Sequence, residues 1–127
     1  MKKSQRGDDL MNLRALLSEA KKDYEKKLMN DEWFFTKFRK SILENIDESN
    51  CFETINNAVM IIIKEEDNYL VYELLVLLND LIRKSNTTEI PNKLEDNLEA
   101  ITQKFKDDDN QEKMWKEILD YYLINTF

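Results

Sequence analysis

The stretch NYLVYELLVLLNDLIRK, residues 68–84, carries the strongest secondary-structure signal in this chain of 127 residues. Its apolar side chains recur at the spacing of one helix face, and they are Leu70, Val71, Leu74, Leu75, Leu78, Leu81 and Ile82. Asp67 precedes the stretch where an N-terminal capping residue belongs. The pattern predicts a long amphipathic helix that buries one face.

Five further amphipathic segments follow from the same apolar spacing. They cover about residues 9–29, 31–46, 51–64 and 91–105, with the last beginning near residue 110. Pro91 stands where a proline of the first helical turn belongs, after the polar loop at 85–89.

The segment at 51–64 is apolar on nearly every side. A helix of that kind belongs in the middle of a fold, in contact with neighbours all round. A buried strand through residues 59–63 is the alternative, because β-branched side chains favour strands. A single strand would leave its backbone groups unpaired, so we predict a helix.

These segments predict an all-α protein of about six amphipathic helices. Alternate helix starts are separated by about 40 residues, the period of two-helix solenoid repeats. Two architectures remain open: stacked hairpins in a short solenoid of the HEAT or armadillo kind, or an irregular helical bundle. We expect residues 1–8 to be a flexible N-terminal segment and residues 9–127 to be one all-helical domain.

The residue types that are absent restrict the chemistry. The chain has no histidine, and Cys51, Gly7 and Pro91 are each the only residue of their type. The usual base that titrates near neutral pH is therefore missing, and a lone thiol cannot supply the ligands of a zinc site. We expect a binding protein that is not an enzyme, with no cofactor and no metal.

The formal net charge of −7 bears on the choice of partner. It disfavours nucleic acid, which needs a basic surface, and suits a basic protein. The charged start of the chain is unlike a secretory signal, and the longest apolar run, residues 58–63, is too short to cross a bilayer. A lone cysteine fits a reducing compartment. We expect a cytoplasmic protein that does not bind a membrane.

Acidic residues gather at three predicted turns. They are Asp31 and Glu32; Glu65, Glu66 and Asp67; and Asp107, Asp108 and Asp109. If the helices stack as three hairpins, these turns share one edge, which could bind a cationic partner. Helix capping is the alternative, because acids are favoured at helix N-termini. Both interpretations remain open.

Two pairs of carboxylates have spacings that could hold magnesium on a helix, as in all-helical nucleotide pyrophosphohydrolases. Glu95 and Glu99 stand one turn apart, and Glu117 and Asp120 are separated by three residues. Motifs this short are more typical of a solvated helix surface.

Aromatic residues crowd the start of the segment at 31–46. Trp33, Phe34 and Phe35 are adjacent, and neighbouring positions on a helix point about 100° apart, so they cannot all face one core. Either the helix is enclosed between neighbours or one ring is exposed. An exposed Trp33 or Phe34 would be a natural anchor for a partner protein.

The run at 69–75, continuing to Ile82, is followed by the loop 85–91 and then by Leu94 and Leu98. This pattern, about a quarter of the chain, resembles small all-helical immunity proteins of bacterial polymorphic and contact-dependent toxin systems. Armadillo-like adaptors share it. The resemblance implies a cytoplasmic inhibitor that binds a toxin domain, often a basic nuclease. A regulatory helical-repeat adaptor and a magnesium-dependent nucleotide pyrophosphohydrolase are the alternatives.

Overall fold

The computed structural model describes residues 12–122, and that part of the chain contains helices and no strand. The described helices are α2 (Leu13–Lys21), α3 (Tyr24–Asn30), α4 (Phe34–Glu44), α5 (Glu48–Lys64), α6 (Asn68–Ser85), α7 (Asn92–Asp96), α8 (Leu98–Phe105) and α9 (Asp109–Tyr121). The predicted all-α class is confirmed. The expected segment 1–8 lies outside the described residues. None of the described helices is both long and apolar enough to cross a bilayer.

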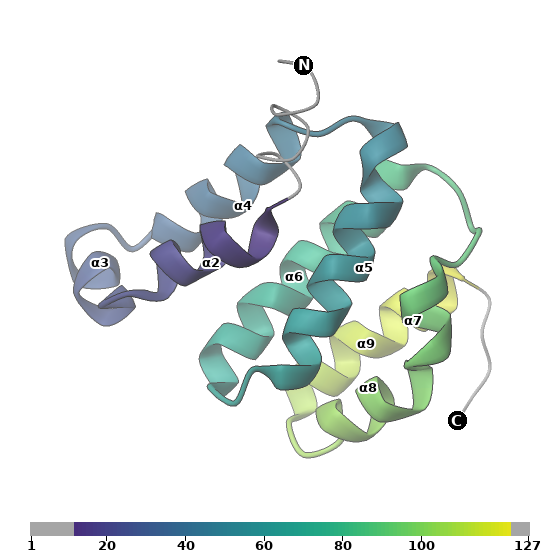
Figure 1. Cartoon of the computed structure of the whole chain (residues 1–127). Coiled ribbons are helices and arrows are strands. Elements are labelled where there is room, and N and C mark those ends of the chain that lie inside the picture. The colour runs from purple at the N-terminus through teal and green to yellow at the C-terminus, as the bar shows by residue number, and fades with distance from the viewer. Residues whose placement is uncertain (1–11, 123–127) are drawn as a thin grey trace.

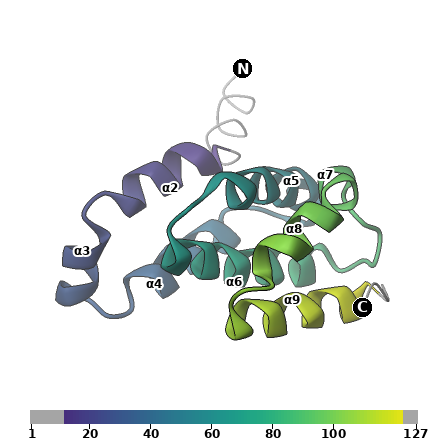
Figure 2. The same cartoon turned by 90° about the horizontal axis from the view of Figure 1, so that it is seen from below.

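The helices form two layers, which Figure 2 shows from the side. One layer contains α2, α5, α7 and α8, and the other contains α4, α6 and α9. Within the first layer α5 contacts α2, α7 and α8, and within the second α6 contacts α4 and α9. The hairpin of α5 and α6 is therefore the centre of the structure (Figure 1).

The core lies mainly between α5 and α6. The buried side chains of α5 include Cys51, Ile55, Val59 and Ile62, and the predicted apolar stripe of α6 is buried with Leu77 added to it. The helix prediction for residues 51–64 is confirmed and the strand alternative is wrong. The helix begins earlier, at Glu48, because the side chain of Asp47 accepts a hydrogen bond from the Asn50 backbone N–H at 3.2 Å.

The first predicted helix is divided. In the described part of residues 9–29, α2 ends at Lys21 and α3 begins at Tyr24, because Asp23 adopts a left-handed conformation with φ 48°. The Lys27 ammonium donates a hydrogen bond of 2.7 Å to the Glu19 carbonyl in the last turn of α2, which also accepts a longer one of 3.4 Å from the Lys22 N–H.

The fifth predicted helix is also divided. Asn97 separates α7 from α8, and its side-chain amide donates a hydrogen bond of 2.7 Å to the Lys93 carbonyl. A side chain that binds its own backbone competes with helix continuation. Pro91 directly precedes α7. The described residues therefore hold eight helices where the sequence predicts about six.

Candidate functional site

Two of the three acidic turns are joined by hydrogen bonds. The side-chain amide of Asn68, at the start of α6, donates to Asp108 Oδ2 at 3.4 Å. The buried side chain of Gln111 donates to Asn68 Oδ1 at 3.1 Å and to the Asn68 carbonyl at 3.3 Å. The turn at 65–67 and the turn at 107–109 therefore lie side by side. We call these six acidic residues the acidic edge.

The other side of the acidic edge contacts the first hairpin, by which we mean α2 and α3 together with α4. The Tyr24 hydroxyl donates a hydrogen bond of 2.7 Å to Asp67 Oδ2. The Lys21 ammonium forms an ion pair of 2.9 Å with Glu65 Oε1, and the Glu65 side chain is only 9% exposed. These contacts fix the turn at 65–67 between its two neighbours.

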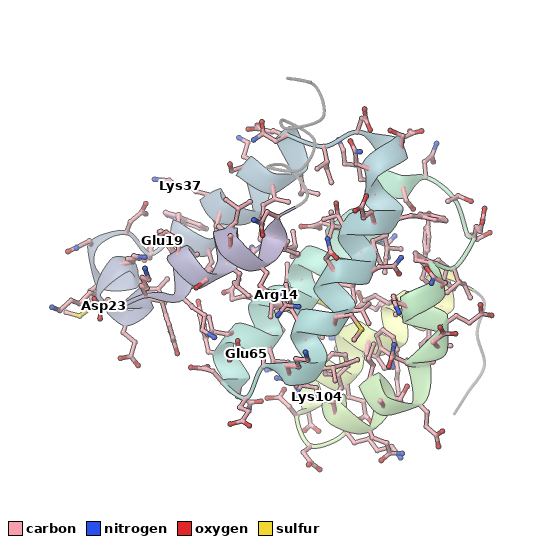
Figure 3. All side chains as sticks on the ribbon, in the orientation of Figure 1. Arg14, Glu19, Asp23, Lys37, Glu65 and Lys104 are labelled. Atoms are coloured by element: carbon pink, nitrogen blue, oxygen red, sulfur yellow. The ribbon has the colours of Figure 1, made fainter. Side chains whose placement is uncertain are left out.

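The third acidic turn lies apart from the acidic edge. Asp31 and Glu32 occupy the tip where α3 passes into α4, at the left of Figure 1. Asp31 pairs with Lys37 at 2.7 Å, and Figure 3 shows Lys37 remote from Glu65. Among residues 12–122, no hydrogen bond or ion pair joins Asp31 or Glu32 to the acidic edge.

Four of the eight predicted carboxylates have structural roles. Asp67 caps α6 by accepting from the backbone N–H groups of Tyr69 and Leu70, and Asp108 caps α9 in the same way from Gln111. Asp31 accepts from the Trp33 N–H, and Glu65 is bound to Lys21. The capping interpretation therefore holds for Asp67 and Asp108.

The pKa values of two of these carboxyls agree with their contacts. The hydrogen bond from Tyr24, followed by those from the Leu70 and Tyr69 backbone, lowers the pKa of Asp67. The hydrogen bond from Lys37 lowers the pKa of Asp31. Both groups are therefore held in the ionised form, which the folded structure stabilises.

The other four predicted carboxylates are exposed: Glu32, Glu66, Asp107 and Asp109. Three of them, Glu66, Asp107 and Asp109, belong to the acidic edge. They are the members of the predicted set whose charge is directed to solvent and is available to a partner.

Cations lie beside the acidic edge as well. The Lys104 ammonium donates a hydrogen bond of 3.5 Å to the Ile63 carbonyl near the end of α5, and Figure 3 shows Lys104 and Glu65 toward the same end of the molecule. A cation at this position interacts favourably with the C-terminal end of the α5 dipole. The surface at the acidic edge therefore carries charges of both signs, and its exposed carboxylates are directed to solvent.

A hollow of about 260 Å³ adjoins the acidic edge between α6 and the start of α9. Its walls are Asn68, Tyr69, Tyr72, Asp108 and Asn110. The Tyr69 side chain is 40% exposed. Neither Tyr69 nor Tyr72 is among the site residues predicted from the sequence. Both are aromatic residues outside the apolar stripe of residues 68–84, and this position is compatible with a surface role without indicating one.

Tyr69 is held by an aromatic cluster. Its ring stacks on Tyr24 at a centroid distance of 5.7 Å and meets Phe35 edge to face at 5.9 Å. Burial and the hydrogen bond to Glu73 raise the pKa of Tyr69 to about 12. The phenol O–H therefore donates to Glu73, and the hydroxyl oxygen keeps its capacity to accept a hydrogen bond from a partner.

The crowded aromatics of α4 divide between the core and the surface. Phe35 is buried and Phe34 is half-buried against it, whereas Trp33 is 59% exposed. Met29, on α3, is 85% exposed. Trp33 is therefore the exposed ring, one of the two arrangements that the sequence allowed.

The remaining candidates lie on the surface or in the core. Glu95 and Glu99 belong to different helices, so the one-turn spacing of a continuous helix does not apply to them. In the part of the chain that the structure describes, no three or more His, Cys, Asp or Glu side chains are arranged so that they could hold a metal ion. Cys51 is buried, its thiol contacts the Asp47 carbonyl at 3.5 Å, and burial raises its pKa.

Comparisons of the chain with protein-family models, with curated proteins and with solved structures found no match.

Proposed function

We propose that this chain is a protein-binding module whose acidic edge binds a basic partner. The observation that carries the proposal is the hydrogen bond from Asn68 to Asp108, which brings two acidic turns together. Glu66, Asp107 and Asp109 are exposed there beside the hollow that Tyr69 and Tyr72 line.

The physical basis is a combination of steering and preorganisation. Exposed carboxylates attract a basic surface and raise the rate of encounter. Tyrosine rings supply contact area with a polar tip and lose few degrees of freedom on binding. The caps and ion pairs at Asp67, Asp108 and Glu65 hold the turns in place before a partner arrives, which lowers the entropic cost of binding.

The specific role that we propose is that of a cytoplasmic immunity protein that neutralises a basic toxin domain. Three features support it: the resemblance over residues 69–101, the net charge of −7 and the arrangement of helices as hairpins in two layers. If α7 and α8 are counted as one divided helix and the short α3 is set aside, successive helices alternate between the layers, which also favours a short solenoid over an irregular bundle.

The test uses the product of the gene immediately upstream of this one, whose C-terminal domain is the expected toxin. The purified domain is titrated into the full chain by calorimetry, and growth protection is scored in cells that express both. The variant Glu66→Lys/Asp107→Lys/Asp109→Lys should fold as the wild type does but lose binding and protection. Loss of affinity by a factor of about 100 or more is expected for three reversed charges at an interface.

The matched control is Glu95→Lys/Glu99→Lys/Glu117→Lys, which changes the net charge by the same amount at exposed positions outside the acidic edge. It should retain binding within about threefold, because distant surface charges act weakly at physiological salt. Equal losses in both variants would refute the acidic edge as the binding site. Absence of binding by the wild type would refute the toxin as the partner.

A regulatory adaptor is the second candidate, and the exposure of Trp33 and Met29 at the tip of the first hairpin favours it. An exposed tryptophan is a frequent anchor of protein interfaces. If Trp33→Ala abolishes binding of a partner while the three reversed charges leave it intact, the tip is the binding surface and the adaptor role is supported.

A further inference from the structure

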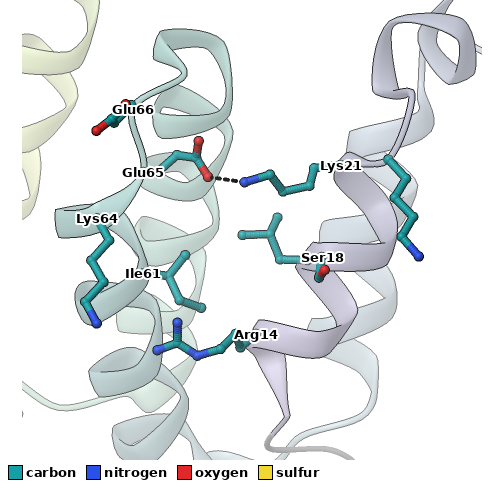
Figure 4. Close-up of a pocket in the computed structure, with 9 residues that line it drawn as sticks. Arg14, Ser18, Lys21, Ile61, Lys64, Glu65 and Glu66 are labelled. Carbon is teal, nitrogen blue, oxygen red and sulfur yellow. Dashed lines mark hydrogen bonds and ion pairs between the residues drawn. The ribbon is translucent and has the colours of Figure 1, made fainter.

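A groove of about 670 Å³ lies between α2 and the C-terminal half of α5 (Figure 4). Its floor is apolar and includes Leu17 and Ile61, whose side chains are buried. Its volume lies within the range of small-molecule sites in proteins.

An ion pair closes one end of this groove. Lys21, on α2, meets Glu65, which directly follows α5, at 2.9 Å, and the dashed line in Figure 4 marks this contact. A linear peptide could not pass through that end without breaking the pair. The groove therefore suits a short ligand that enters from the other end.

The other end of the groove is cationic. Arg14 and Lys64 come from opposite walls, both are exposed, and Figure 4 shows them extending away from the Lys21–Glu65 pair toward the same end. Within residues 12–122, neither has an ion-pair partner.

The acidic residue Glu66 does not neutralise these two cations. Figure 4 shows Glu66 pointing away from Arg14, on the far side of Glu65. Lys22, which also lines the groove, forms an ion pair of 3.4 Å with Glu19. A chain with a net charge of −7 therefore presents a local cationic site directly beside an apolar floor.

We propose that this groove binds a small amphiphilic anion. Its phosphate or carboxylate group lies between Arg14 and Lys64, and its apolar body covers Leu17 and Ile61. The guanidinium of Arg14 can bind either group in a bidentate manner, and Lys64 adds a point charge. Nucleoside monophosphates and medium-chain fatty acids such as octanoate both carry an anionic group on a less polar body.

The groove and the acidic edge have different ligands. The acidic edge binds a basic protein through exposed carboxylates, whereas the groove binds an anion through Arg14 and Lys64. A failure of one proposal therefore leaves the other intact.

The test records amide chemical shifts of the full chain during titration with AMP and, separately, with octanoate. At least one of the two should shift the signals of residues lining the groove, and the one that binds identifies the source of the anion. Arg14→Ala/Lys64→Ala should weaken that binding by about tenfold or more, which corresponds to one lost charged hydrogen bond. Lys40→Ala/Lys113→Ala removes two exposed charges elsewhere and should leave the affinity unchanged.

Adenosine and inorganic phosphate serve as half-ligands of AMP, and octanol and acetate as half-ligands of octanoate, since the first of each pair lacks the anion and the second lacks the less polar body. Each should bind at least about tenfold more weakly than its whole ligand, because it makes only part of the contacts. The proposal is overturned if neither whole ligand shifts the groove signals. It is also overturned if the anionic half-ligand alone binds equally well, or if Arg14→Ala/Lys64→Ala binds with wild-type affinity.

Discussion

The Tyr24 hydroxyl donates a hydrogen bond of 2.7 Å to Asp67 Oδ2, and this contact joins the first hairpin to the N-terminus of α6. Asp67 uses its other carboxylate oxygen to accept from the backbone N–H groups of Tyr69 and Leu70. One carboxylate therefore caps the central helix and also fixes the position of α3. The chain changes direction between α2 and α3 at the left-handed Asp23, and the contact of Tyr24 with Asp67 attaches α3 to the start of α6.

Replacing Tyr24 by phenylalanine should lower the free energy of unfolding by about 1 kcal/mol, because it removes one hydrogen bond to a charged group and keeps the ring. The stacking on Tyr69 should remain. Chemical denaturation of the two proteins measures the difference. Tyr121→Phe is the matched control, since Tyr121 contacts Arg83 through its ring, and it should change stability less. An equal effect at both positions would contradict the role of the hydroxyl.

Stability should fall in acid because the pKa values of Asp31, Asp47 and Asp67 are lower in the folded chain than in the unfolded one. Groups of this kind stabilise the fold above their unfolded pKa, near 4, and this contribution is lost as the pH falls through the folded pKa. Thermal unfolding between pH 7 and pH 2 measures the loss. Asp67→Asn should be less stable at pH 7 and should show a smaller decrease in acid.

Stability should also fall in alkali. The pKa of Tyr24 is raised from 10.0 to about 12, chiefly by its hydrogen bond to Asp67, so the folded state favours the protonated phenol. This contribution is complete below pH 10 and is lost as the pH rises toward 12. Tyr24→Phe should therefore lose less stability than the wild type between pH 9 and pH 11. A steeper loss in the variant would show that another group controls the alkaline transition.

Arg39 on α4 forms an ion pair with Glu73 on α6, and their side chains are only 17% and 15% exposed. Arg39→Met should destabilise the fold by about 1–2 kcal/mol, between the values for exposed and for buried pairs, because Glu73 loses its partner. Arg39→Met/Glu73→Gln should recover part of that loss. Lys22→Met, which breaks an exposed pair, should have little effect. A double variant less stable than the single one would contradict this account.

The sequence predicts a helix correctly where an apolar stripe begins directly after a capping residue. Residues 68–84 have such a stripe and the cap Asp67, and the observed α6 covers them. The breaks at Asp23 and Asn97 were not readable, since the apolar pattern continues through both. At each break a side chain donates a hydrogen bond to a carbonyl at the end of the preceding helix: Lys27 at the first and Asn97 at the second. These bonds stabilise a helix end at a point where the apolar pattern predicts that the helix continues.

For the eight candidate carboxylates, too, one part of their arrangement was predictable from the sequence and another part was not. Their position at the turns between helices follows from capping chemistry and was readable for Asp67 and Asp108. Which turns meet depends on Asn68, Gln111 and Asp108, residues whose polar contacts join segments about 40 positions apart. The tyrosines beside them were missed because an aromatic ring outside the apolar stripe has no helical periodicity to identify it.

The sequence by itself determined that this chain is helical, that α5 and α6 supply the core and that acids occupy the turns, because these properties depend on local spacing and capping. Only the tertiary structure decided that two acidic turns lie side by side while the third lies apart, and that Arg14 and Lys64 line the same groove. Those outcomes depend on how whole helices pack against one another. That packing is determined jointly by residues that are distant in the sequence.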